Sequence, residues 1–261
     1  MGLQLMQRYF VEPHQISGHL VTITGDDVHH IVKVMRSRTG QEIVVSDGQS
    51  RTARARLSQL DAGRNLVQAE VVEWLDEQRE LPIDVTIAQG LPKGDKWEWI
   101  LQKGTELGAS AFFPFSSERA VAKLDEKKEP KKRERWQKIV KEAAEQSHRT
   151  RLPVVLPARS FQQTIEEIPR YTACAIAYEQ SSGFGLHAVL DSLGPGDSLL
   201  VLIGPEGGFS AEEAAQATAA GAVAVSLGPR ILRTETASQY VLAAVSYHFE
   251  QTNGERRESN G

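Results

Sequence analysis

The chain has very little cysteine. Cys174 is the single thiol among 261 residues, which excludes a disulfide within the chain. A sequence of this kind is typical of the reducing cytoplasm, and we expect a cytoplasmic protein. Cys174 lies in the apolar run ACAIAY, so we expect it to pack in the core rather than to act as a nucleophile.

Long hydrophobic runs are absent as well. No apolar segment approaches the length that a helix needs to cross a bilayer, so we expect no membrane partner. The first residues, MGLQLMQRYFVEP, contain no apolar stretch followed by a small-residue cleavage site, and we expect no signal peptide.

Two nucleotide-binding motifs are missing. The glycine-rich segment GPEGG has no GK[ST] ending, so it is not a phosphate-binding Walker loop. No GxGxxG follows the first strand expected in the α/β region, which disfavours a Rossmann dinucleotide site.

Overall positive charge is also missing, since the formal net charge is −4. The cations are nevertheless concentrated: residues 119–151 hold twelve Lys or Arg against six Asp or Glu. A local basic patch can bind RNA phosphates on an acidic protein. Such a run can equally be a solvated helix face, and the charge alone leaves both interpretations open.

The pattern changes along the chain from strands to alternating strands and helices. Residues 1–75 contain short strand candidates with one helical stretch, Asp26–Met35, and residues 76–82 form a charged linker. Residues 83–251 alternate strands with helices, which predicts an α/β domain with a mainly parallel sheet. Residues 252–261 are polar, and we expect a disordered tail.

The stretch from Val201 to Ser238 contains the clearest signal for a ligand site. Two apolar runs, Leu199–Ile203 and Ala222–Leu227, each end in a Gly-Pro pair, as buried strands that open into loops do. Two such strand ends side by side would make the crevice in which open α/β sheets bind small ligands. Ser210-x-x-Glu213 is a capping box that starts a helix between them. On spacing alone, two ordinary strand-to-helix turns remain the alternative.

Longer motifs carry a family resemblance. LIGPEGGFS at 202–210 and LGPRILRTETA at 227–237 are supported by QGLPKGDKWEWILQKGTELG at 89–108, SERAV at 117–121 and EAAEQSHR at 142–149. On these motifs the chain resembles the ribosomal RNA small-subunit methyltransferase E family of the SPOUT, or trefoil-knot, superfamily. The resemblance implies a PUA-like β-barrel followed by a knotted, mainly parallel sheet with flanking helices. It implies S-adenosylmethionine as methyl donor, N3 of a uridine in 16S ribosomal RNA of the 30S subunit as acceptor, and a homodimer.

The two C-terminal motifs supply the expected site residues. Arg233 would stabilise the uridine anion, and Glu206 would act as the base or hold the loop together. The residues expected to bind the cofactor are Leu202, Ile203, Gly204, Leu227, Gly228, Ile231, Leu232 and Thr236. We also expect Thr236-x-x-Gln239 to cap the last helix.

Basic and polar residues form two groups of candidate RNA contacts. Those of the β-rich domain are His29, Lys33, Arg36 and Arg38, and those around the pocket are Lys93, Lys96, Arg119 and Arg149. For each of the four residues around the pocket, a role in surface solubility is the alternative. His29 and His30 have no other ligand-spaced His or Cys nearby, so we expect no metal.

Two other functions remain open. The chain could be a non-catalytic RNA-binding factor with a degenerate pocket, although the intact glycine-rich motifs argue against degeneration. It could also be a SPOUT-type enzyme that acts on transfer RNA, which only a comparison of substrates can decide.

Overall fold

The computed structural model describes residues 6–49, 51–120, 127–179 and 184–251. The chain divides into two compact units: Met1–Glu80 with Ala144–Leu152, and Leu81–Ala143 with Pro153–Gly261. The boundaries expected from the sequence stay predictions, and the tail predicted at 252–261 lies outside the described residues.

The first unit is built on a six-stranded mixed sheet, in the order β1-β4-β5-β6-β3-β2. Strand β5 shows why these residues form a sheet: Ala53, Ala55 and Leu57 are buried, while Arg54 and Arg56 between them lie nearer the solvent. The elements are β1 (Arg8–Phe10), η2 (Pro13–Gln15), β2 (Ile16–Ser17), β3 (Leu20–Thr24), α1 (Asp26–His29), η3 (His30–Val34), β4 (Glu42–Ser46), β5 (Thr52–Asp61) and β6 (Leu66–Leu75).

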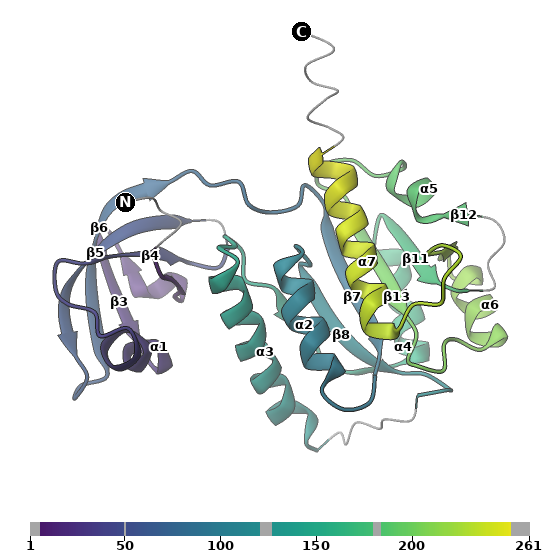
Figure 1. The fold of residues 1–261 in the computed structure, drawn as a ribbon, viewed down its shortest axis with the longest axis horizontal. Helices are drawn as coiled ribbons and strands as arrows, with labels where there is room; N and C mark the ends of the chain where they lie inside the picture. Colours follow the sequence, from purple (N-terminus) through teal and green to yellow (C-terminus); the bar gives the residue numbers. More distant parts are fainter. Residues whose placement is uncertain (1–5, 50, 121–126, 180–183, 252–261) are drawn as a thin grey trace, which may run out of the picture. The chain divides into compact units, whose positions relative to one another are not determined.

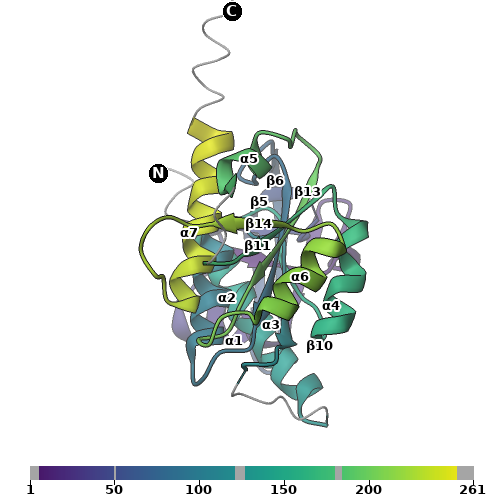
Figure 2. The same cartoon turned by 90° about the vertical axis from the view of Figure 1, so that its right-hand side faces the viewer.

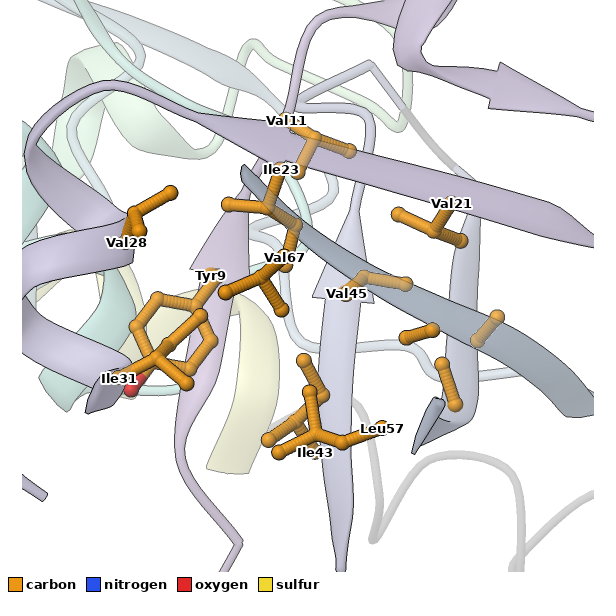
Figure 3. Close-up of a cluster of buried hydrophobic side chains, with 13 residues drawn as sticks. Tyr9, Val11, Val21, Ile23, Val28, Ile31, Ile43, Val45, Leu57 and Val67 are labelled. Atoms are coloured by element: carbon orange, nitrogen blue, oxygen red, sulfur yellow. The ribbon is translucent and has the colours of Figure 1, made fainter. Parts of the chain in front are cut away.

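The helical stretch predicted between the strands is present as α1 and η3. Val28 and Ile31 extend from it into the apolar core, beside Tyr9 (Figure 3). The hydroxyl of Tyr9 lies 3.0 Å from Nδ1 of His30, so a polar contact also ties this stretch to β1.

The segment Ala144–Leu152 completes the first unit through hydrogen bonds. Ser46 Oγ donates to the carbonyl of Thr150 at 2.9 Å, and Arg8 Nη1 donates to the carbonyl of Arg149 at 3.2 Å. The backbone N–H of Leu152 donates to the carbonyl of Gly48 at 3.0 Å. This unit therefore draws on two distant parts of the chain.

The second unit contains an eight-stranded sheet whose pairs are all parallel among the described residues, as the alternation of strands and helices predicted. The order is β10-β8-β7-β13-β11-β14-β12, with β9 also on β8. Its strands are β7 (Asp84–Gly90), β8 (Ala111–Ser116), β9 (Val154–Val155), β10 (Arg159–Ser160), β11 (Ala173–Ala177), β12 (Phe184–Gly185), β13 (Ser198–Ile203) and β14 (Val223–Ser226).

Helices cover both faces of this sheet. α2 and α7 lie on one face, and α4 and α6 lie on the other (Figures 1 and 2). The bounds are α2 (Lys96–Glu106), α3 (Glu129–Gln146), α4 (Phe161–Glu167), η4 (Ile168–Arg170), α5 (Leu186–Leu190), α6 (Ala211–Ala219), α7 (Thr234–Ser246) and η5 (Tyr247–Gln251). No described helix is long and apolar enough to cross a membrane.

The start of α7 differs from the prediction. The helix begins at Thr234 with Arg233 as N-cap residue and without a side-chain cap, so the cap expected from Thr236 is wrong. Thr236 lies within the first turn, where its own N–H already donates to the carbonyl of Arg233 at 2.9 Å.

Candidate active site

A pocket of about 410 Å³ opens where strands β13, β11 and β14 end. Two loops form most of its wall: the β13 loop, residues 204–210, and the β14 loop, residues 227–233. The lining residues are Lys96, Ala177, Tyr178, Glu179, Ile203, Gly204, Pro205, Glu206, Gly207, Gly208, Phe209, Val225, Ser226, Leu227, Gly228, Arg230, Ile231, Leu232, Arg233, Thr234 and Ala237. The two Gly-Pro corners predicted to meet thus line one pocket.

Glycine is required where the backbone turns or approaches another strand. A Cβ at Gly90 would lie 2.5 Å from Cδ of Pro205, so only glycine lets the end of β7 pass the β13 loop. Gly228 has a φ of +106°, which a side chain disfavours, and this lets the β14 loop turn away from its strand.

The two loops do not follow neighbouring strands. β11 lies between β13 and β14, which corrects the expectation that those two strand ends would be side by side. The end of β11 therefore adds Ala177, Tyr178 and Glu179 to the pocket wall. The motifs of the two loops gave no indication of these residues, because they follow a third strand of the sheet.

Most of the predicted cofactor residues line the pocket: Ile203, Gly204, Leu227, Gly228, Ile231 and Leu232. Leu202 does not. It is fully buried, in the core that the sheet forms with α4 and α6, because its side chain points to the opposite face of β13 from that of Ile203. Thr236 is exposed on α7, and the pocket instead meets that helix at Thr234 and Ala237.

Arg233 stands at the pocket wall with an exposed side chain. It forms no ion pair with any residue that the structure describes. Its carbonyl accepts the N–H groups of Thr236 and Ala237, each at 2.9 Å, so its backbone is fixed by the first turn of α7. The guanidinium is therefore held on a fixed backbone and available to a ligand.

Glu206 is held by two donors. Its Oε1 accepts from Lys96 Nζ at 3.0 Å and from the N–H of Lys93 at 3.1 Å. Burial alone would raise the pKa of this carboxyl, but these hydrogen bonds outweigh that effect and hold the pKa of Glu206 below its ordinary value. Lys96 Nζ also lies 3.3 Å from Oε2 of Glu235, and the hydrogen bond to Glu206 is the main reason why the pKa of Lys96 is raised.

Arg119 also contacts the β13 loop. Its Nη1 donates to the carbonyl of Gly207 at 3.2 Å. The buried Glu213 accepts from the N–H of Glu118 at 2.9 Å and from the N–H of Ser210 at 3.0 Å. Lys93, Lys96 and Arg119 thus all contact one loop. Glu213 of the predicted capping box joins that loop to the segment after β8.

Arg149 belongs to the first unit. Its side chain is only 4% exposed, and it forms an ion pair with Glu80, whose Oε2 accepts from Nε at 3.0 Å. Such burial disfavours the predicted RNA contact. The other four candidates of this unit, His29, Lys33, Arg36 and Arg38, are all exposed, on and just after α1 and η3.

Family models match both units. Residues 79–246 match the model described as an RNA methyltransferase domain, and residues 23–72 match an RNA methyltransferase PUA domain. The chain is 49% identical over 258 residues to ribosomal RNA small subunit methyltransferase E of Bacillus subtilis, which covers 96% of this chain and 100% of that protein. The chain belongs to the ribosomal RNA small subunit methyltransferase E family.

Solved structures similar to this chain show the same fold. A ribosomal RNA small subunit methyltransferase E from Neisseria gonorrhoeae, bound to S-adenosyl methionine, is 32% identical, with a TM-score of 0.82 over 92% of this chain and 97% of that one. A putative methyltransferase from Legionella pneumophila, in complex with the same cofactor, is 27% identical with a TM-score of 0.81 at the same coverage. The predicted family and fold class, a small β-rich domain followed by a SPOUT-type parallel sheet, are confirmed.

Proposed function

We propose that this chain is an S-adenosylmethionine-dependent methyltransferase that methylates N3 of a uridine in 16S ribosomal RNA. The observation that carries the proposal is the pocket between the β13 and β14 loops, in a chain of the methyltransferase E family. We expect the reaction to take place in the cytoplasm, on the small subunit or its RNA.

The pocket fits S-adenosylmethionine in size and chemistry. A volume of about 410 Å³ lies in the range of small-molecule sites. Ile203, Leu227 and Leu232 would form apolar walls for the adenine, and the backbone at Gly204 and Gly228 would bind its polar edge. When bound, the cofactor supplies a methyl group on a sulfonium.

The protein must make a poor nucleophile reactive. N3 of neutral uridine carries a proton, and its loss leaves negative charge on the uracil oxygens. Arg233 is proposed to bind those oxygens, because preorganised charge is usually the largest catalytic contribution. The same attraction stabilises the N3-deprotonated uridine, so that hydroxide from the solvent can take the N3 proton before methyl transfer. Glu206 is proposed to anchor the β13 loop, because a carboxylate with a lowered pKa is a weak base.

The target base must leave its helix before it reaches the pocket. N3 lies on the Watson–Crick edge, so a paired uridine has to be flipped out or already single-stranded. Lys93 and Arg119, both exposed beside the β13 loop, are proposed to bind the displaced backbone. His29, Lys33, Arg36 and Arg38 are proposed to bind RNA on the first unit.

A homodimer accounts for exposed aromatic side chains on α2 and α7. Trp99 is 49% exposed on α2, and Tyr240 and Tyr247 are 44% and 66% exposed on α7 and in η5 just after it. The two helices cover the same sheet face (Figure 2). We expect Tyr240→Glu with Tyr247→Glu to convert a dimer into monomers in light scattering. A monomeric wild type at micromolar concentration would refute this.

The decisive experiment is methyl transfer to small subunits from a strain that lacks the enzyme. We expect labelled methyl to enter 16S RNA and reverse transcription to stop at one uridine, because N3 methylation blocks base pairing. Calorimetry should show binding of S-adenosylmethionine. Absence of both binding heat and methyl transfer would favour a non-catalytic RNA-binding factor. Methylation of transfer RNA in place of 16S RNA would identify transfer RNA as the substrate.

Arg233→Ala tests the mechanism. We expect kcat to fall by about 100-fold or more with little change in cofactor affinity. Arg230→Ala, in the same loop and also exposed, is the matched control and should change kcat far less. Equal effects of the two substitutions would remove Arg233 from its special role.

A further inference from the structure

Gln89 connects the two pocket loops from inside the protein. It lies near the end of β7 and is fully buried. Its Nε2 donates to Thr234 Oγ1 at 2.7 Å and to the carbonyl of Gly204 at 3.2 Å. Thr234 Oγ1 in turn donates to the same carbonyl at 2.6 Å. Three residues from three separate elements thus form a closed hydrogen-bonded triangle.

Close packing alone does not explain a glutamine at this buried position. The amide oxygen of Gln89, Oε1, is buried without a hydrogen-bond partner among the described residues. An unpaired buried acceptor destabilises a protein, and an unbranched apolar side chain of similar length would avoid it. The Nε2 group of the same amide must therefore provide hydrogen bonds that an apolar side chain could not, namely those to Thr234 and Gly204.

Two of the three residues in the triangle adjoin proposed functional parts of the site. Gly204 begins the β13 loop and lines the pocket, and Thr234 directly follows Arg233. Fixing Thr234 against Gly204 therefore fixes the backbone from which the Arg233 side chain extends, relative to the pocket wall.

We infer that Gln89 is a positioning residue, whose amide holds Thr234 against Gly204 and thereby sets the place of Arg233 at the pocket. The inference rests on the proposed function and deepens it. Gln89 is fully buried and is not among the residues that line the pocket. Its effect reaches the reaction through Thr234 and Arg233.

Substitutions at both ends of the hydrogen bond test the inference. Gln89→Met keeps the length of the side chain and removes the donor, while Thr234→Val keeps the shape and removes the hydroxyl. Thr234→Ser keeps the hydroxyl and is the matched control. We expect kcat to fall by about 10- to 100-fold in the first two variants, because a displacement of about 1 Å costs this much in a positioned site. We expect Thr234→Ser to stay near wild type.

Two readouts separate positioning from general damage. The Kd for S-adenosylmethionine should rise by less than about fivefold, because the apolar walls remain, so that the loss falls on kcat. The loss of kcat in the double variant Gln89→Met/Thr234→Val should be smaller than the product of the two single losses, since both substitutions break the shared Gln89–Thr234 hydrogen bond. Additive losses would overturn the inference.

Hydrogen exchange provides a test that does not depend on activity. The N–H groups of Thr236 and Ala237 both donate to the carbonyl of Arg233 and report on the first turn of α7. We expect them to exchange at least about tenfold faster in Gln89→Met and Thr234→Val, and unchanged in Thr234→Ser. Unchanged exchange in all variants overturns the inference, as does faster exchange with wild-type kcat.

The same experiment distinguishes failure of the inference from failure of the proposed function. If the wild-type chain neither binds the cofactor nor transfers methyl, the function fails and the catalytic part of the inference fails with it. The exchange rates still decide whether Gln89 holds the two loops together.

Discussion

Two donors on one carboxylate oxygen decide how Glu206 can act. Because Lys96 and the N–H of Lys93 both stabilise the ionised form, the pKa of Glu206 lies below its ordinary value of 4.5. A group of this kind stays charged throughout the neutral range and offers little driving force for taking a proton. The contacts thus favour an anchor over a base.

Glu206→Gln separates these two roles. The amide still accepts from the N–H of Lys93, so we expect kcat to fall by less than about tenfold, with an unchanged pH dependence of kcat between pH 6 and 9. Lys96→Met breaks the same ion pair from the other side and should cause a loss of similar size. If the profile is extended below pH 6, loss of its acidic limb, where kcat rises with pH, in Glu206→Gln alone would identify Glu206 as the base.

Single residues show where the sequence was sufficient and where it was not. The apolar run and the Gly-Pro pair placed Ile203 and Gly204 at the site, and both line the pocket. Leu202 could not be separated from Ile203, because β13 is buried on both faces and shows no polar alternation. Charge likewise suggested an exposed Arg149, whereas an ion pair with Glu80 from another part of the chain buries it.

At the scale of elements, the start of α6 was predictable from four residues. Ser210 Oγ accepts from the N–H of Glu213 at 3.2 Å, and Glu213 returns the contact to Ser210, as the capping box predicted. The second contact of Glu213, with Glu118, joins residues that are 95 positions apart and leaves no local pattern. The order of β13, β11 and β14 in the sheet could not be predicted from the sequence either, since it depends on pairing between distant strands.

Substitutions in this box should differ in their effect on stability. Ser210→Ala should lower the free energy of unfolding by about 1 kcal/mol, the usual value for a lost cap. Glu213→Ala should cost about 2–3 kcal/mol, because the N–H groups of Ser210 and Glu118 both lose their acceptor. Urea unfolding would measure both, with Glu212→Ala, exposed in the same turn, as a control near zero. Equal losses for Glu212 and Glu213 would contradict the assignment.

At the scale of the molecule, the first unit depends on buried charge. Arg8 pairs with Glu77, and Arg149 pairs with Glu80, which also accepts from the N–H groups of Thr150 at 2.8 Å and Arg151 at 3.0 Å. Burial alone would raise the pKa of Glu80, but Arg149 and these backbone donors lower it below its ordinary value of 4.5.

This lowered pKa makes stability depend on pH in a definite direction. The stabilisation by Glu80 is present above the pKa of the unfolded chain and is lost as the pH falls through the lower pKa of the folded protein. Glu80→Gln should therefore cost about 3 kcal/mol at pH 7, and the difference from wild type should shrink below pH 4.5. Glu73→Gln, at a pair with Arg54 in which Glu73 is 55% exposed, should change stability by well under 1 kcal/mol. A difference for Glu80→Gln that is constant with pH would refute the linkage.

The uneven charge of the whole chain predicts salt-dependent RNA binding despite the net charge of −4. Combined Lys33→Ala, Arg36→Ala and Arg38→Ala substitutions should weaken binding of 16S RNA. They should also reduce the slope of log K against log salt by about 2–3, one for each lost phosphate contact. Affinity for S-adenosylmethionine, measured by calorimetry, should not change. An unaltered slope would remove these residues from the RNA interface.

The return of Ala144–Leu152 to the first unit has a consequence for how the protein is made. Arg8 donates to the carbonyl of Arg149, and Glu80 accepts from the N–H of Thr150. The strands that are synthesised first therefore depend on contacts with a segment that leaves the ribosome much later. When Leu152 leaves the ribosome, more than half of the 261 residues have been translated, including strands β7 and β8 of the second unit. The unit that emerges first is therefore unable to finish folding until part of the second has emerged.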